Sequence, residues 1–130
     1  MKIFYTLFLI SILSSCNLSI QKYRDIKTTQ NSFVDGSSDI PLLIGMNKVS
    51  EDELGFESSN GSISCAIYNF ENDDEKIMDF YGKTLLQLGW KEISKESNKI
   101  SFSRDKQNLT IEINTKKHNR TIKFFISSLL

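Results

Sequence analysis

Alternating apolar and polar residues run through most of the chain after position 52 and predict β-strands. In the segment DELGFES the apolar positions are Leu54 and Phe56, and in SISCAIYNF they begin with Ile63, Cys65 and Ile67. The Asn-Gly pair between these segments is typical of a tight hairpin turn, because both central residues of such a turn take positive φ. Four further runs follow, separated by the polar turns KESN, RDKQN and KKHN; they cover 90–94, 99–103, 109–115 and 121–126. Their spacing predicts an antiparallel meander.

The spacing of the apolar residues changes between SISCAIYNF and the run at 90–94, where NDDEKIMDFYGKTLLQLGW predicts a helix. Its apolar residues recur at spacings of three and four, at Ile77, Phe80, Tyr81, Leu85 and Leu88. Asn72 or Asp73 can cap the N-terminus, and acidic residues follow where the helix dipole favours them. Gly89 stands where a left-handed residue commonly ends a helix. The predicted helix covers residues 73–88.

These elements predict an α+β fold, an antiparallel sheet in the order ββαββββ with the one helix packed on one face. Residues 39–130 form a single globular domain in this interpretation, because a chain of this length supports one core. An apolar content of 39% is sufficient for such a core. One face of the last three strands carries the core positions, which are Ile100, Phe102, Leu109, Ile111, Ile113, Ile122, Phe124 and Ile126.

Four aromatic residues near the helix permit two interpretations. Tyr68, Phe80, Tyr81 and Trp90 either pack in the core or line a cleft between helix and sheet that binds a small ligand. We favour core packing, because these residues occupy positions that the core needs.

The segment DIPLLIG, residues 39–45, is the one apolar stretch of the domain outside the predicted helix and strands. Pro41 favours an extended conformation of the residue before it, and Gly45 permits a turn. The segment is expected to cover an open edge of the core. Alternatively, Pro41, Leu42, Leu43 and Ile44 form an exposed patch that docks a partner.

The N-terminus has the three parts of a secretory signal, which are a basic start, an apolar centre and small residues at the exit. The uncharged stretch IFYTLFLISIL would reach only ~16 Å as a helix at roughly 1.5 Å per residue. A bilayer core of about 30 Å needs ~20 apolar residues, so this stretch is too short to span it. We expect residues 1–15 to be removed.

The exit sequence Leu13-Ser14-Ser15-Cys16 resembles the lipobox of bacterial lipoproteins. That resemblance implies that the Cys16 thiol carries a diacylglyceryl group and that the chain is cut between Ser15 and Cys16. Two or three acyl chains anchor a protein stably, since each buried CH₂ contributes about 0.8 kcal/mol. Asn17 follows, where aspartate would favour retention in the inner membrane, so the expected location is the outer membrane, facing the periplasm. Residues 16–38 are polar and are expected to form a flexible tether.

A second resemblance spans residues 39–126. DIPL with a nearby glycine, the early Asn-Gly hairpin and FYGKTLLQLGW together resemble a group of small envelope lipoproteins of alphaproteobacteria, in which a helix ending in LGW leads into a strand meander. The matching motifs are structural, and the resemblance supplies no catalytic residue.

Charge and residue chemistry exclude several functions. The net charge is zero, but ten acidic and two basic side chains lie within 39–79, against ten basic and four acidic within 83–123. Either the two parts neutralise each other on packing, which we favour, or they form an oriented partner surface. The basic residues are dispersed, which argues against nucleic-acid binding.

With Cys16 lipidated, Cys65 is expected to be a buried, inert thiol, and the single histidine, His118, to lie in an exposed turn. No nucleophile, phosphate-loop or metal motif is present, so we expect neither catalysis nor a cofactor or metal. The favoured function is a lipid-anchored accessory that docks another envelope protein. The alternative is a periplasmic module that binds a small ligand or peptidoglycan.

Overall fold

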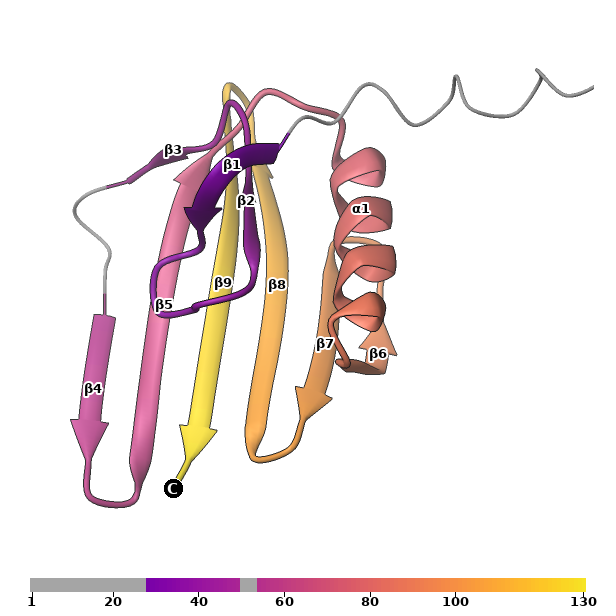
Figure 1. Ribbon diagram of the computed structural model, residues 1–130. Coiled ribbons are helices and arrows are strands. Elements are labelled where there is room, and N and C mark those ends of the chain that lie inside the picture. The colour runs from indigo at the N-terminus through magenta and orange to yellow at the C-terminus, as the bar shows by residue number, and fades with distance from the viewer. Residues whose placement is uncertain (1–27, 50–53) are drawn as a thin grey trace, which may run out of the picture.

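The computed structural model describes residues 28–49 and 54–130, which contain a mainly antiparallel sheet and one helix. The main sheet has seven strands. Six follow the order β3-β5-β9-β8-β7-β6, and the seventh, β4, pairs with β5 on the same side as β3 (Figure 1). A separate two-stranded sheet pairs β1 (Thr28–Phe33) with β2 (Pro41–Leu43). The remaining elements are β3 (Asn47–Lys48), β4 (Leu54–Ser58), β5 (Gly61–Asn69), α1 (Asp74–Gln87), β6 (Lys91–Lys95), β7 (Lys99–Arg104), β8 (Gln107–Lys116) and β9 (Asn119–Leu129).

The predicted α+β class is confirmed, but the predicted order ββαββββ is wrong for the domain as a whole. From β4 onward the order is the expected one, while β1, β2 and β3 precede it. The sequence of β1, TTQNSF, has no apolar alternation, and β2 and β3 are too short to show a period. The folded region also begins before the predicted boundary at residue 39, because β1 starts at Thr28 and Val34 is fully buried.

The core lies on one face of the main sheet, which we call the inner face. The eight positions predicted for β7, β8 and β9 are all buried. Helix α1 covers this face beside β6 and β7, and the β1–β2 hairpin covers it near β5 and β9 (Figure 1). Val34, Ile40, Leu43 and Met46 of the hairpin region complete the core.

Helix α1 forms within one residue of the predicted bounds because its end signals are local. The Asp73 carboxylate accepts a hydrogen bond from the Glu75 N–H at 3.0 Å. At the other end Gly89 has φ +85°, and the Trp90 N–H donates to the Leu85 carbonyl at 3.0 Å. These contacts satisfy backbone groups that the helix itself leaves unpaired.

The predicted hairpin between β4 and β5 is confirmed, but the predicted turn geometry is wrong. Ser58 pairs with Gly61, so Ser59 and Asn60 are the central residues, and neither has positive φ. Gly61 instead has φ +151°, and a Cβ there would meet the carbonyl oxygen of Ser128 on β9. The glycine is therefore required by the close approach of β9.

Candidate functional site

The four aromatic residues considered for a ligand cleft pack mainly into the core. Tyr68, Tyr81 and Trp90 are buried, and Phe80 is half-buried against the same cluster. Phe124 of β9 packs edge-to-face against both tyrosines, with ring centroids 5.9 Å from Tyr68 and 5.2 Å from Tyr81. Phe80 packs in the same way on Tyr81 at 5.1 Å. Neighbouring rings therefore occupy the surfaces that a ligand would need.

The hydroxyl groups of the two tyrosines attach the hairpin region to the core. The Tyr81 hydroxyl donates to the Pro41 carbonyl at 2.9 Å, and the Tyr68 hydroxyl donates to the Asp35 carboxylate at 3.0 Å. Lys48 forms an ion pair with the same carboxylate at 3.0 Å and lowers the pKa of Asp35. Burial raises the pKa of both tyrosines. Both phenols are consequently neutral hydrogen-bonding groups at neutral pH.

The DIPLLIG segment contributes β2 and closes over the inner face. Leu43 is buried, Pro41 and Leu42 are half-buried, and Ile44 is exposed. Three of the four residues considered for partner docking thus contribute at least partly to the packed interior, which favours the covering role.

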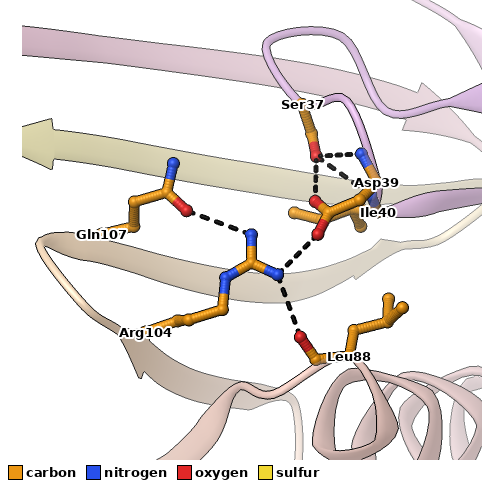
Figure 2. A network of polar contacts seen from close by, with 6 residues as sticks. All are labelled: Ser37, Asp39, Ile40, Leu88, Arg104 and Gln107. Atoms are coloured by element: carbon orange, nitrogen blue, oxygen red, sulfur yellow. Dashed lines mark hydrogen bonds and ion pairs between the residues drawn. The ribbon is translucent and has the colours of Figure 1, made fainter.

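A polar network joins this segment to the end of α1 and to β7 (Figure 2). The Arg104 guanidinium donates to the Asp39 carboxylate, to the Leu88 carbonyl at 3.0 Å and to the Gln107 side chain at 3.1 Å. It also lies 4.3 Å from the centre of the Trp90 ring. One side chain therefore connects three segments that are distant in the sequence.

The Asp39 carboxylate is held by the loop as well as by Arg104. The Ser37 hydroxyl donates to this carboxylate at 3.2 Å and accepts from the Ile40 N–H at 3.0 Å (Figure 2). The hydrogen bond from Arg104 lowers the pKa of Asp39, although partial burial opposes this effect. The acidic and basic parts of the chain also meet at Asp74 and Arg120, which form a second ion pair. These pairs support the interpretation that the two parts neutralise each other.

The opposite face of the sheet, the outer face, carries exposed apolar side chains. We define the outer patch as Phe56, Ile63 and Phe125, whose exposed fractions are 66%, 43% and 43%. Phe56 on β4 is directly opposite Ile63 on β5. Two residues further along β5, Cys65 is directly opposite Phe125 on β9. Directly opposed residues project from the same face of a sheet, so these side chains are neighbours. Cys65 is buried, as predicted.

On β7 and β8 the outer face is polar. Thr110 lies opposite Phe125 and forms a hydroxyl contact with Ser101 at 3.3 Å. In the next row Lys123 is opposite Glu112, which is opposite Lys99. Oppositely charged cross-strand neighbours of this kind suit a solvated sheet face. The outer patch itself lies on β4, β5 and β9, beside one edge of the sheet.

The sequence did not distinguish the outer patch from the core. In SISCAIYNF apolar residues occupy both parities, with Ile63, Cys65 and Ile67 on one and Ala66 and Tyr68 on the other. The structure buries Ala66 and Tyr68 on the inner face. Apolar residues at both odd and even positions indicate a strand with apolar side chains on both faces, and this was the one feature of the sequence that pointed to the outer patch.

Ser15 and Cys16, the predicted cleavage and attachment positions, lie outside the described residues. His118 is exposed in the turn between β8 and β9, as predicted. Within residues 28–49 and 54–130 no cluster of three metal-ligating side chains occurs, and no helix is both long and apolar enough to cross a membrane. No protein-family model, curated protein or solved structure matches the chain.

Proposed function

We propose that this chain is a bacterial lipoprotein, anchored to the cell envelope through Cys16, whose folded domain docks another envelope protein without catalysing a reaction. The proposed location is the outer membrane, with the domain facing the periplasm. The observation that carries the docking role is the outer patch, formed by Phe56, Ile63 and Phe125.

The anchor is supported by the sequence before the domain. A short apolar segment precedes Leu13-Ser14-Ser15-Cys16, and the small residues Ser14 and Ser15 suit a protease that must approach the backbone closely. The resemblance of residues 39–126 to small envelope lipoproteins of alphaproteobacteria agrees with this placement. Acyl chains on Cys16 would hold the domain at a membrane surface, where its partner would also lie.

The docking role is supported by the contrast between the two faces of the sheet. The inner face is covered by α1 and the hairpin, whereas the outer patch exposes two phenylalanines and an isoleucine side by side. Clustered apolar side chains at a surface are typical of protein-binding sites, where aromatic residues contribute much of the affinity. The polar side chains on the outer face of β7 and β8 would form part of the rim of such an interface.

The alternative, a module that binds a small ligand or peptidoglycan, has less support. It relies on Tyr68, Phe80, Tyr81 and Trp90, and three of these side chains are buried in the core. The proposal of a non-catalytic role rests on the missing sequence motifs for nucleophilic, phosphate and metal chemistry.

The anchor is tested by comparing the full chain with its Cys16→Ser variant in a bacterial host that acylates lipoproteins. We expect the parent protein to sediment with membranes and to yield a diacylated fragment starting at Cys16 by mass spectrometry. The variant is expected to leave the membrane fraction while the domain stays folded. Equal membrane retention of both proteins would contradict the anchor.

The docking role is tested by photo-crosslinking in living cells of the native host. A photoreactive amino acid at Phe125 is expected to give one recurrent adduct with another envelope protein. The matched control is the same group at Thr110, the polar neighbour directly opposite on β8. Equal crosslinking from both positions, or none from Phe125, would contradict docking through the outer patch.

A further inference from the structure

The edge of the sheet beside the outer patch is formed by β4. In the part of the chain that the structure describes, β4 pairs with β5 and with no other strand (Figure 1). An edge strand presents a row of backbone N–H and C=O groups to which another strand can pair. Only the residues of β4 whose N–H and C=O groups point away from β5 can pair with such a strand.

The hydrogen bonds of β5 reveal that direction. At its two ends the Asn60 carbonyl accepts from Leu130 and the Phe70 N–H donates to Arg120, so even-numbered residues direct their backbone groups toward β9. The Ile67 carbonyl accepts from Val49, so odd-numbered residues direct theirs toward the side of β3 and β4. The alternation is a general property of antiparallel ladders.

This alternation identifies the hydrogen-bonded residue pairs between β4 and β5. Phe56 lies opposite Ile63, an odd-numbered residue, so the backbone groups of Phe56 point toward β5. Gly55 and Glu57 lie opposite Ser64 and Ser62, which face β9, so their own N–H and C=O groups point away from β5. The open edge therefore offers the backbone groups of Gly55 and Glu57.

The other edge of the sheet, β6, carries features that discourage strand pairing. Its sequence KEISK has a lysine at each end, and its pairing with β7 shifts register between Glu92 and Ser94. Edge lysines and bulges commonly prevent association between sheets. The sequence of β4, LGFES, has neither lysine nor proline, and its register with β5 is continuous.

We propose that β4 pairs antiparallel with β4 of a second copy of this chain, across a two-fold axis at Phe56. In that register Gly55 faces the partner's Glu57, and their outward groups form four backbone hydrogen bonds in total. The two copies of Phe56 then lie opposite each other on the outer face, in the closer, non-hydrogen-bonded type of pair. Aromatic cross-strand pairs of this kind are favourable.

Charge selects this register and this edge. Opposing Gly55 to Glu57 places no like charges together, whereas a register centred on Glu57 would oppose two carboxylates. The same two-fold pairing at β6 would set Lys91 opposite the partner's Lys95. At Gly55 a Cβ would meet nothing within 4 Å, so the face of the sheet at this position has room for the alanine of the control variant.

The dimer goes beyond the proposed function and depends on neither the anchor nor another envelope protein. It would join two outer patches into one apolar strip across the axis. Because each β4 strand has only five residues, the contact is small and its affinity modest, in the range of transient interfaces.

The first test traps the pairing as a disulfide in unfractionated cells that produce the full chain. Under mild oxidation, Phe56→Cys is expected to give a covalent dimer, since the two thiols would face each other across the axis. Ile93→Cys on β6 is the matched control, because Ile93 and Phe56 have similar exposed fractions of 60% and 66%. The parent chain, with Cys65 intact, sets the background.

The second test blocks the edge without adding a thiol. Gly55→Pro removes one outward N–H but no hydrogen bond to β5, and edge strands tolerate proline at such positions. Gly55→Ala keeps the N–H and serves as its control. For the detergent-solubilised full chain we expect light scattering to detect a concentration-dependent dimer in the parent and in Gly55→Ala, and its loss in Gly55→Pro. Circular dichroism checks that each variant is folded.

Three outcomes would overturn the inference: equal disulfide yields from Phe56→Cys and Ile93→Cys, a parent protein that stays monomeric at all concentrations, or a folded Gly55→Pro variant that dimerises like the parent. The first two are also expected if another segment of the chain occupies the edge. If Gly55→Pro does not fold, the disulfide comparison alone decides. None of these results affects crosslinking from Phe125 to another protein.

Discussion

Replacing Arg104 with alanine should destabilise the domain more than any other single change in the polar network of Figure 2. The substitution removes the donors to Asp39, Leu88 and Gln107 and the cation above Trp90. It therefore releases the loop before β2 and the end of α1 from β7 at the same time.

The size of the effect follows from these contacts. The ion pair with Asp39 is partly exposed and contributes at most about 1 kcal/mol. A hydrogen bond from a charged donor to the Leu88 carbonyl contributes about 1.5 kcal/mol, and the cation above Trp90 about 0.5–1 kcal/mol. We expect a total loss of about 2–3 kcal/mol for Arg104→Ala. Arg104→Lys should lose about half of this, because it keeps the charge but not the planar fork.

Urea unfolding followed by tryptophan fluorescence measures this loss directly, since Trp90 is the only tryptophan in the chain. With a slope of about 1–3 kcal/mol per M, the midpoint of Arg104→Ala should fall by roughly 1–2 M. The folded-state emission should also shift to longer wavelength. The indole Nε1 is buried and has no hydrogen-bond partner among residues 28–49 and 54–130, and the substitution would make it accessible to water.

Gln107→Ala is the matched control, because it removes one contact of the network and should cost about 0.5–1.5 kcal/mol. If Arg104→Ala and Gln107→Ala have the same midpoint, the reasoning is refuted, and the network does not hold the three segments together. If Arg104→Ala fails to fold, Arg104→Lys provides the comparison.

Two further predictions concern the acid limit of stability and the hairpin. In the folded protein the pKa of Asp39 lies below its ordinary value of 3.8. The ionised Asp39 therefore stabilises the fold at pH values above 3.8, and this stabilisation should be lost as the pH falls through the lower pKa of the folded state. When the free energy of unfolding is measured against pH, Arg104→Ala should lose less stability in acid than the parent. Gly61→Ala should cost about 2 kcal/mol or more, because it combines positive φ with a clash against the Ser128 carbonyl; a thermal melting temperature equal to that of Gly55→Ala would contradict this explanation.

The sequence by itself determined the elements whose signals are local. The ends of α1 were predictable because the Asp73 cap and the Gly89 terminus act on backbone groups within a few residues. The strands β7, β8 and β9 were predictable because each buries one parity of an alternating run. For the same reason the core positions on these strands were correctly identified.

Only the tertiary structure decided which side of β5 enters the core. Its apolar residues occupy both parities, and the pairing with β9 turns Ala66 and Tyr68 inward and leaves Ile63 on the outer patch. Register is a relation between strands, so no local pattern within β5 specifies it. The role of Gly61 was hidden in the same way, because the carbonyl that excludes a side chain there belongs to Ser128 on β9.

The short strands and the Arg104 network depend on the assembled fold for the same physical reason. β2 and β3 have three and two residues, and they form where the chain closes over the core rather than through their own periodicity. Asp39 and Arg104 are 65 positions apart, and they meet because the loop before β2 packs beside the end of β7. Local patterns determined α1 and the strands β7, β8 and β9, whereas contacts between distant segments determined the short strands and the surfaces that the elements expose.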